Sequence, residues 1–398
     1  MSAPLAVAHL DTGRDWRGGQ AQVLLLARGL ERRGVRNLVL APRGPLLERA
    51  AAEGLATAEW SPRGEWDFGA VMRGARLLAE ARVQVAHCHS AHAHAVGVPA
   101  ARLAGVPAVV VSRRVDFAIA RHPLSALKYR LPVDRYLCIS RGVMEVMRAG
   151  GVPESRLALV PSGIEFPDPP PGPDLRGLLG VGPDAPIVGT VAALAPHKNH
   201  ADLLRAAAEV VRERPDVHFA WVGDGECREA LLALRSRLRL ERNVHLLGFR
   251  DDAHALLRQF TVFALASWLE GLCTSLLDAQ ALGVPAVATR VGGIPDVIED
   301  GVNGRLVPPR DPAALIEALR RPDLRSQWVA AAQRSVQAFH TDRTVERTLV
   351  EYQAALGGRR RERNDTPGAA RKLPFQKGEQ HPTVRRSSRL LDAPHDAG

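Results

Sequence analysis

The sequence contains no long apolar run, and this absence excludes a membrane-spanning helix. No stretch reaches about 18 consecutive apolar residues, whereas a helix needs about 20 to cross the hydrocarbon core of a bilayer. The N-terminal segment also lacks the basic flank and the long apolar core of a signal peptide. We therefore expect a cytoplasmic protein. The chain has 398 residues, of which 46% are hydrophobic, which is enough for two domains.

Cysteine is scarce, and its spacing excludes two further classes of protein. The four cysteines lie far apart and form no C-x-x-C pair: Cys88, Cys138, Cys227 and Cys273. Disulfide-stapled domains have a denser cysteine framework, and structural zinc sites have closely paired ligands. We expect all four cysteines to be small buried side chains in a reducing compartment.

Lysine is also rare, with four lysines among 53 basic residues. The net charge of +10 is uneven: residues 1–165 carry +8, residues 166–356 carry −3 and residues 357–398 carry +5. The basic first part indicates an acidic partner, such as a phosphorylated substrate or an anionic lipid surface. A general bias toward arginine is the alternative explanation. Nucleic acid is not expected as a partner, because no basic motif with interleaved aromatic residues occurs.

Short apolar runs typical of strands alternate with amphipathic runs along most of the chain. The expected strands are residues 5–10, 37–41, 83–87, 108–111, 136–139, 157–160, 187–192, 217–222, 244–247, 262–266, 287–289 and 305–307. The expected helices include 20–33, 70–81, 91–104, 141–149, 200–214, 275–282, 311–319, 324–339 and 341–356. Continuously apolar strands separated by helices indicate an α/β protein with parallel sheets. We expect two Rossmann-like, doubly wound domains that face each other across a cleft.

A proline-rich stretch at residues 166–174 interrupts this alternation, because proline is not tolerated inside a helix or a central strand. The expected division is an N-terminal domain at 1–165, a linker at 166–186, a C-terminal domain at 187–335, a helix at 336–356 that packs back toward the N-terminal domain, and a disordered basic tail at 357–398.

Glycine-rich or charged loops follow several of the expected strands. Gly18-Gly19 permits close backbone approach, and the helix after it would direct free N–H groups at an anion; a plain tight turn is the alternative. The spacing is not the dinucleotide pattern G-x-G-x-x-G. Lys198 could reach a phosphate from the carboxyl edge of the second sheet, with a solvated lysine as the alternative. Gly223-Asp-Gly225 is explained by a turn.

The segment from Ser267 to Val287 is the most informative. Glu270 is expected in a loop directly after a strand, and a helix is expected to begin near Thr274 or Ser275. A diphosphate could rest on the N-terminus of that helix. With Asp278 one turn further along, two carboxylates could hold two hydroxyl-bearing parts of one ligand. For Asp278 alone, a favourable interaction with the helix dipole is the alternative.

The order of these motifs resembles retaining glycosyltransferase family 4, also called glycosyl transferases group 1, which has the GT-B fold. The matching segments in the second half are Lys198-Asn-His, Gly223-Asp-Gly, Leu247-Gly-Phe249, Glu270-x7-Asp278, Gly283-Val-Pro-Ala-Val-Ala, Gly292-Gly-Ile-Pro-Asp296 and Asp300-Gly-Val-Asn-Gly-Arg-Leu-Val307. A looser match in the first half includes Gly18-Gly19, His87-x-His89, Ile139-Ser140 and Val160-Pro-Ser-Gly-Ile164. The resemblance covers about residues 5–356.

The resemblance implies transfer of a sugar from a UDP- or GDP-linked donor with retention of anomeric configuration. It implies that Lys198 binds the donor diphosphate, Glu270 the sugar hydroxyls and Asp278 the ribose, while Gly18 and Gly19 approach the phosphates from the other domain. The further donor-binding residues that it implies are Gly223, Asp224, Gly248, Phe249, Leu272, Cys273, Thr274 and Ser275. No metal and no cofactor are expected, since such enzymes commonly need no metal and the sequence has no convincing D-x-D motif.

The sequence departs from the family pattern at three places. Asp278 stands where glutamate is usual, and Ala193 stands where the family often has an arginine that contacts a phosphate. Many members also have a histidine after the strand matching residues 108–111, where this chain has Ser112-Arg113-Arg114. His89 is therefore the candidate catalytic histidine beside Glu270 and Lys198, with a neutral structural histidine as the alternative. Arg113 and Arg114 are expected on the acceptor side.

We therefore expect a retaining hexosyltransferase in which the leaving diphosphate helps to accept the proton of the acceptor. The acceptor is expected to be a cell-envelope glycan or glycolipid, and the segment 112–130 is a candidate docking face for an anionic membrane. A sugar-nucleotide-binding protein with weak catalysis is the alternative, because of Ala193 and the missing histidine.

Overall fold

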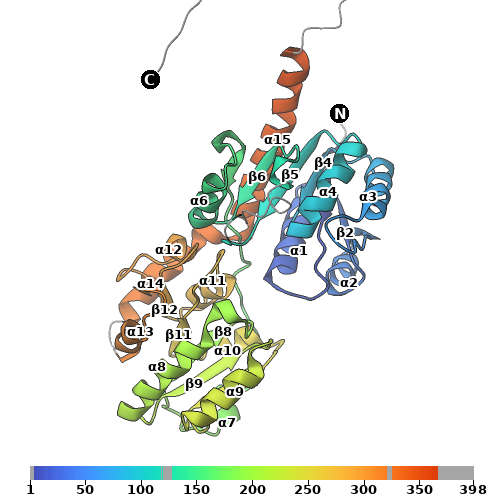
Figure 1. Ribbon diagram of the computed structural model, residues 1–398. Helices are drawn as coiled ribbons and strands as arrows, with labels where there is room; N and C mark the ends of the chain where they lie inside the picture. The colour runs from blue at the N-terminus through green and yellow to red at the C-terminus, as the bar shows by residue number, and fades with distance from the viewer. Residues whose placement is uncertain (1–3, 118, 120–127, 321–324, 366–398) are drawn as a thin grey trace, which may run out of the picture.

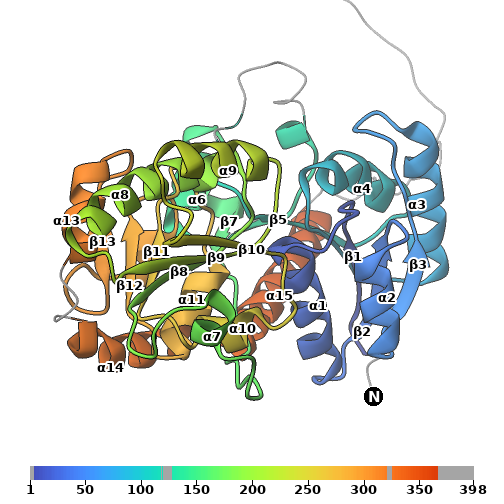
Figure 2. The same cartoon turned by 90° about the horizontal axis from the view of Figure 1, so that it is seen from below.

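Two parallel β-sheets, each with helices on both faces, make up the computed structural model (Figures 1 and 2). The structure describes residues 4–117, 119, 128–320 and 325–365. The strand order is β3-β2-β1-β4-β5-β6-β7 in the first sheet and β10-β9-β8-β11-β12-β13 in the second. These two sheets confirm the predicted α/β fold with two Rossmann-like domains.

Every predicted strand is present, with its ends shifted by at most two residues. The N-terminal domain contains β1 (Ala6–Leu10), β2 (Arg36–Ala41), β3 (Ala56–Glu59), β4 (Val85–Cys88), β5 (Ala108–Arg113), β6 (Arg135–Cys138) and β7 (Leu157–Leu159). The C-terminal domain contains β8 (Ile187–Val191), β9 (His218–Val222), β10 (Val244–Gly248), β11 (Val262–Leu265), β12 (Ala286–Thr289) and β13 (Arg305–Val307). The strand that the sequence analysis missed is β3, an edge strand of four residues that is not fully buried anywhere.

The helices lie between these strands and at the end of the chain. They are α1 (Gly18–Glu31), α2 (Pro45–Ala52), α3 (Phe68–Glu80), α4 (Ala91–Leu103), α6 (Arg141–Ala149), α7 (Leu175–Leu179), α8 (His200–Glu213), α9 (Arg228–Arg237), α10 (Ala253–Leu257), α11 (Thr274–Ala281), α12 (Ile294–Val297), α13 (Pro312–Arg320), α14 (Arg325–Ser335) and α15 (Thr341–Asp365). Among the helices that the structure describes, none has the length and apolar character to cross a membrane.

The chain passes between the two domains twice, at adjacent places. Ile164 donates its backbone N–H to Phe339 O at 2.9 Å and accepts from Thr341 N at 2.9 Å. The C-terminal part of the predicted linker belongs to the C-terminal domain, because Leu175 of α7 is fully buried and its N–H donates to Gln259 Oε1. The proline-rich crossing itself is therefore shorter than predicted.

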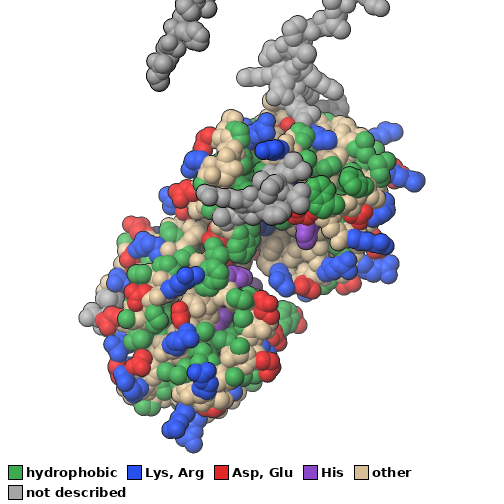
Figure 3. Space-filling model, in the orientation of Figure 1, with side chains coloured by type: hydrophobic (Ala, Val, Ile, Leu, Met, Phe, Trp, Pro, Cys, Tyr) green, Lys and Arg blue, Asp and Glu red, His purple; other side chains and the backbone are tan. Residues whose placement is uncertain are grey.

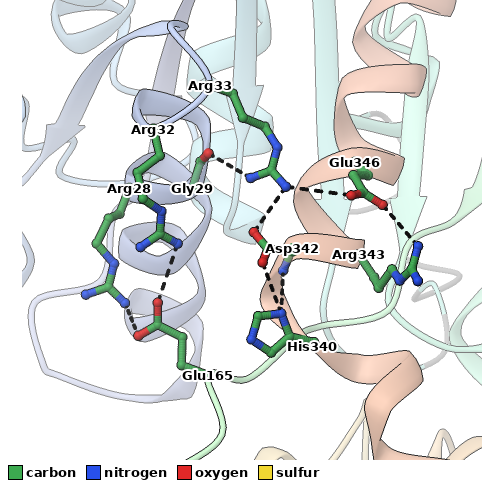
Figure 4. A network of polar contacts seen from close by, with 9 residues as sticks. All are labelled: Arg28, Gly29, Arg32, Arg33, Glu165, His340, Asp342, Arg343 and Glu346. Atoms are coloured by element: carbon green, nitrogen blue, oxygen red, sulfur yellow. Dashed lines mark hydrogen bonds and ion pairs between the residues drawn. The ribbon is translucent and has the colours of Figure 1, made fainter.

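Helix α15 packs on the N-terminal domain although it follows the C-terminal domain in sequence (Figure 1). A polar network between α1, residue 165 and the start of α15 lines this contact (Figure 4). Arg28 and Arg32 both pair with Glu165, and Arg33 pairs with Asp342 at 3.0 Å and with Glu346. These ion pairs are partly exposed, so each contributes at most about 1 kcal/mol. Apolar burial must supply most of the stability of this contact.

The boundary predicted for the disordered tail was wrong. Helix α15 continues to Asp365, past the expected end at residue 356. The segment 359–363 is Arg-Arg-Arg-Glu-Arg, and both arginine and glutamate have high helix propensity. The rest of the predicted tail, residues 366–398, lies outside the described residues.

At Gly29, where α1 has no side chain, α15 packs closely against α1. A methyl group built on Gly29 would lie 2.5 Å from Cγ2 of Val345, which is fully buried. We expect Gly29→Ala to lower the free energy of unfolding in urea by about 1–3 kcal/mol through overpacking, although alanine has the higher helix propensity. In a Val345→Ala background, Gly29→Ala should cost nothing. An equal loss in both backgrounds would contradict this explanation.

Several buried histidines should make the fold sensitive to acid. Burial lowers the pKa of His94 to about 3 and that of His9 to about 4, from about 6.5 in the unfolded chain. Between these values only the unfolded chain takes up the proton, so stability is full above pH 6.5 and falls as the pH decreases below it. We expect His94→Gln to reduce this fall, measured by urea unfolding at several pH values, by up to about 1.4 kcal/mol per pH unit. The exposed His92, changed to Gln, is the matched control.

Candidate functional site

The two domains form two lobes with a notch between them (Figure 3). Loops at the carboxyl ends of β5 and β6 contact loops that follow β11 and β12, and at two points their backbones approach closely. A Cβ on Gly142 would lie 2.6 Å from Gly292 O, and one on Gly271 would overlap Arg114 O. The motifs predicted to bind a donor lie beside this contact, where ligands of doubly wound sheets usually bind.

Lys198 and Glu270 form a direct ion pair in this region. Lys198 lies in the loop after β8 and Glu270 in the loop after β11, and these two strands are neighbours in the sheet. Lys198 Nζ donates to Glu270 Oε2 at 2.5 Å, and Ser267 Oγ donates to the same oxygen at 3.2 Å. Burial is the largest single effect and lowers the pKa of Lys198, but the charge and hydrogen bond of Glu270, together with the charges of Cys273 and Asp116, outweigh it and raise that pKa. The lysine therefore carries its charge at neutral pH.

The main chain of Glu270 contacts a residue that the sequence analysis did not single out. Asp116, in the segment after β5, accepts the Glu270 backbone N–H at Oδ2 at 3.0 Å. Burial raises the pKa of the Asp116 carboxyl. In the sequence, Asp116 is recognisable only as a carboxylate shortly after a strand. No motif around it indicates that it contacts the other domain.

Two helix N-termini face each other across the notch. Helix α11 begins at Thr274 without a side-chain cap, and α1 begins at Gly18. A Cβ on Gly18 would lie 3.8 Å from Thr274 Oγ1, and one on Gly19 would meet nothing within 4 Å. The dipoles and first-turn N–H groups of both helices provide partial positive charge for an anion such as a diphosphate. Ser275 Oγ lies 3.3 Å from Cys273 Sγ at the same helix start.

The remaining predicted donor residues lie on nearby strand ends of the C-terminal sheet. Gly223 donates its N–H to Gly248 O at 2.8 Å, which joins the ends of β9 and β10. Phe249, directly after β10, is 65% exposed. Asp224 accepts the N–H of Gly225 within its own turn. Leu272 and Cys273, which follow Glu270 in the same loop, are buried.

Asp278 has a partner that the sequence did not predict. The Nε2 atom of His254, in α10, lies 3.3 Å from Asp278 Oδ2. The hydrogen bond to Asp278 raises the pKa of His254. A protonated His254 would therefore compete with ligand hydroxyls for this carboxylate, and the pair places a titratable group at the proposed ribose position.

His89 lies inside the N-terminal domain, where both of its ring nitrogens are engaged. Arg114 Nη2 lies 3.2 Å from His89 Nδ1, His89 Nε2 lies 3.0 Å from His9 Nδ1, and His9 Nε2 lies 3.1 Å from Asn37 Oδ1. Because a guanidinium only donates, a single tautomer of each neutral ring satisfies the whole chain of contacts. Burial lowers the pKa values of His9 and His89, so both rings are neutral.

The neighbouring His87 completes this polar interior. Its Nδ1 lies 2.7 Å from Tyr352 Oη and its Nε2 lies 2.8 Å from Ser112 Oγ. Nitrogens of His9, His87 and His89 lie within 4.8 Å of one another, which is close enough for a shared metal ion. The donor set does not fit one, since each ring nitrogen already has a partner and the Arg114 cation lies against His89.

The two predicted acceptor-side arginines point to different partners. Arg113 Nη2 donates to the backbone oxygen of Phe117 in its own loop. Arg114 reaches His89 and, at 3.4 Å, Ser162 Oγ. Arg114 and the Glu270 loop are in backbone contact through Gly271, so this arginine lies at the edge of the contact between the domains.

Comparison with protein families supports the resemblance seen in the motifs. Residues 16–166 match the model described as Glycosyltransferase Family 4, and residues 185–322 match the model described as Glycosyl transferases group 1. The two models fall on the two domains of the structure.

Curated relatives are glycosyltransferases. The chain is 28% identical over 262 residues to the Escherichia coli UDP-Gal:alpha-D-GlcNAc-diphosphoundecaprenol alpha-1,3-galactosyltransferase, covering 62% of this chain and 68% of that protein. It is 32% identical over 303 residues to the D-inositol 3-phosphate glycosyltransferase of Geodermatophilus obscurus, covering 70% of this chain and 63% of the relative. The chain thus spans about half to two thirds of the length of such relatives.

Solved structures show the same fold. Anabaena HepE in complex with UDP and glucose has a TM-score of 0.77 at 20% identity, covering 88% of this chain and 100% of that chain. Sucrose-phosphate synthase from Thermosynechococcus elongatus has a TM-score of 0.74 at 18% identity, covering 89% and 100%. With both domains matched by family models and both sheets arranged as in these structures, the chain belongs to the family 4, group 1 glycosyltransferases of the GT-B fold.

Proposed function

We propose that the protein transfers a hexose from a UDP- or GDP-linked donor to an acceptor, with retention of anomeric configuration. The observation that carries this proposal is the buried Lys198–Glu270 ion pair beside the uncapped N-terminus of α11, opposite the N-terminus of α1. A cation and two helix N-termini suit a diphosphate, and a carboxylate beside them suits sugar hydroxyls. The E. coli relative uses a UDP-sugar, and HepE binds UDP and glucose.

Donor binding would exchange the partners of the ion pair. The diphosphate would take the Lys198 ammonium, and the Glu270 carboxylate would turn to hydroxyls of the sugar. Asp278 would hold the ribose, with Phe249 and Gly248 beside the base and Gly223 and Asp224 at the adjacent turn. The ion pair would thus keep the Lys198 ammonium and the Glu270 carboxylate charged and in place at the site before the donor binds.

In the reaction, the acceptor hydroxyl would attack the anomeric carbon from the face that the diphosphate leaves. The departing phosphate oxygen would accept the acceptor proton, while Lys198 and the α11 N-terminus stabilise the charge that develops on it. We propose that these groups, rather than a resident metal or cofactor, supply the positive charge. His89 has no free ring nitrogen, so we propose that it positions Arg114 on the acceptor side instead of transferring a proton.

A panel of nucleotide-sugars tests this proposal: transfer or hydrolysis of one donor is expected, with the α configuration of the product read by NMR when the donor is α-linked. A protein that binds a donor and never turns it over would instead be a sugar-nucleotide-binding protein.

Lys198→Ala should separate phosphate binding from nucleoside binding. We expect the mutant to bind the free nucleoside diphosphate about 10- to 100-fold more weakly, because a hydrogen bond to a charged group contributes about 1.5–3 kcal/mol. Binding of the nucleoside, measured by the same calorimetry, should hardly change. Equal losses for both ligands would indicate a folding defect and remove Lys198 from the diphosphate site.

We propose that the acceptor is a cell-envelope glycan or glycolipid and that the N-terminal domain binds the membrane peripherally from the cytoplasmic side. The support is an exposed apolar patch on α3 and the loop before it: Trp66, Phe68 and Met72 are 56%, 75% and 62% exposed. A groove beside them is lined by apolar residues and by the Lys128–Glu65 ion pair. Of the docking segment predicted at 112–130, residues 118 and 120–127, including Arg121, lie outside the described residues.

Vesicle co-sedimentation tests this membrane face. Binding should require anionic lipid and weaken with salt, because exposed Arg63 and Arg73 flank the patch in sequence and each basic group contributes about 1 kcal/mol near such a surface. We expect Phe68→Ser with Met72→Ser to abolish binding. Leu178→Ser, at an exposed apolar residue of the C-terminal domain, is the control. Binding that ignores lipid charge or survives the α3 changes would contradict the proposal.

A further inference from the structure

The backbone of Glu270 is held from both sides at the contact between the domains. Its N–H donates to Asp116 Oδ2 of the N-terminal domain at 3.0 Å, and its C=O accepts from Gly293 N of its own domain at 3.1 Å. These two contacts fix the peptide units on either side of Glu270. They leave its side chain free to exchange partners while the main chain stays in place.

Gly292 leaves little space around the Asp116 carboxylate. Gly292 has a φ of +51°, and a Cβ on it would overlap Glu270 O and lie 2.7 Å from Asp116 Oδ2. The left-handed φ and the absent side chain both call for glycine here. Only a backbone without a side chain lets the Asp116 carboxylate reach the amide of Glu270.

A second hydrogen-bonded tie joins the domains at a different place. Arg141, at the start of α6, donates from its backbone N to Asp296 Oδ2 and from Nε to Asp296 Oδ1, both at 2.7 Å. Among the described residues, no hydrogen bond or ion pair joins either member of this pair directly to Glu270. The Arg141–Asp296 tie therefore contributes to the contact between the domains without a direct bond to Glu270.

We propose that Asp116 is a positioning residue that fixes the Glu270 loop in its sugar-binding orientation when the two domains are in contact. This inference rests on the proposed function, in which Glu270 holds the sugar of the donor. When Lys198 turns to the diphosphate, Glu270 loses its cation, and the hydrogen bond to Asp116 is the contact from the opposite domain that still fixes its backbone. The contact between the two domains and the position of Glu270 at the sugar are thereby coupled through the side chain of Asp116.

Hydrogen exchange and kinetics on two variants test the proposal. In Asp116→Ala the Glu270 amide should exchange at least about tenfold faster, and kcat should fall by about tenfold or more while the Kd of the nucleoside diphosphate stays within about twofold. Asp116→Asn keeps an oxygen that can accept the same N–H. It should therefore restore slow exchange and most of kcat.

Arg141→Ala is the matched control, because it removes the other tie between the domains. It should leave the exchange rate of the Glu270 amide unchanged. The proposal is overturned if that amide exchanges at the wild-type rate in Asp116→Ala, if Asp116→Asn is as impaired as Asp116→Ala, or if Arg141→Ala reproduces the same acceleration. A wild-type protein that transfers no sugar would refute the proposed function, while the exchange rates would still decide whether Asp116 holds the loop.

Discussion

The site depends on the close approach of two backbones, which is possible only because glycine occupies both sides of the contact. A Cβ on Gly142 would lie 2.6 Å from Gly292 O, one on Gly271 would overlap Arg114 O, and one on Gly292 would overlap Glu270 O. Side chains at such positions would hold the domains apart by the width of a methyl group or more. The carboxylate of Asp116 would then lose the amide of Glu270, which it meets at 3.0 Å. The glycine loops thus set the distance at which groups from the two domains act together.

Charge at this contact is balanced in two different ways. Lys198 and Glu270 are both largely buried, and an isolated charge there would cost several kcal/mol, so each offsets the burial cost of the other. Arg114 instead donates to neutral partners, His89 and Ser162. The neutral His89 ring accepts a hydrogen bond from the Arg114 guanidinium without cancelling its charge. On the C-terminal side Lys198 and Glu270 neutralise each other, whereas on the N-terminal side the charge of Asp11 favours the charged form of Arg114.

The alternation of apolar strands predicted both sheets except for the edge strand β3, but it could not show which loops meet. Lys198 and Glu270 were each placed at a strand end, yet their contact follows from β8 and β11 being neighbours, which requires the strand order. The contact between Asp116 and Glu270 also requires the orientation of the two domains, which no local pattern contains. His89 was named as a catalytic candidate because Ser112-Arg113-Arg114 replaces the histidine that many family members have, and a structural histidine was the alternative. The partners of His89 come from β1 (His9) and from the segment directly after β5 (Arg114), and their engagement of both ring nitrogens is visible only in three dimensions.

Helix α15 connects the end of the chain to the interior behind the site. Tyr352 Oη lies 2.7 Å from His87 Nδ1, and the His87 ring lies 3.9 Å from that of His89, which contacts Arg114. Val345, Tyr352 and Ala355 are buried in one cluster with residues of β1 and α1, including Val7 and Leu30. Without α15 the N-terminal sheet would expose this apolar face and leave a buried histidine nitrogen unpaired, at a cost of about 1–3 kcal/mol for the nitrogen alone. The N-terminal domain is therefore complete only when the chain has passed through the C-terminal domain and returned. The crossing at Ile164 and Thr341 is thus a requirement for the packing of the N-terminal sheet and for the hydrogen bonds of His87, and not only a tether.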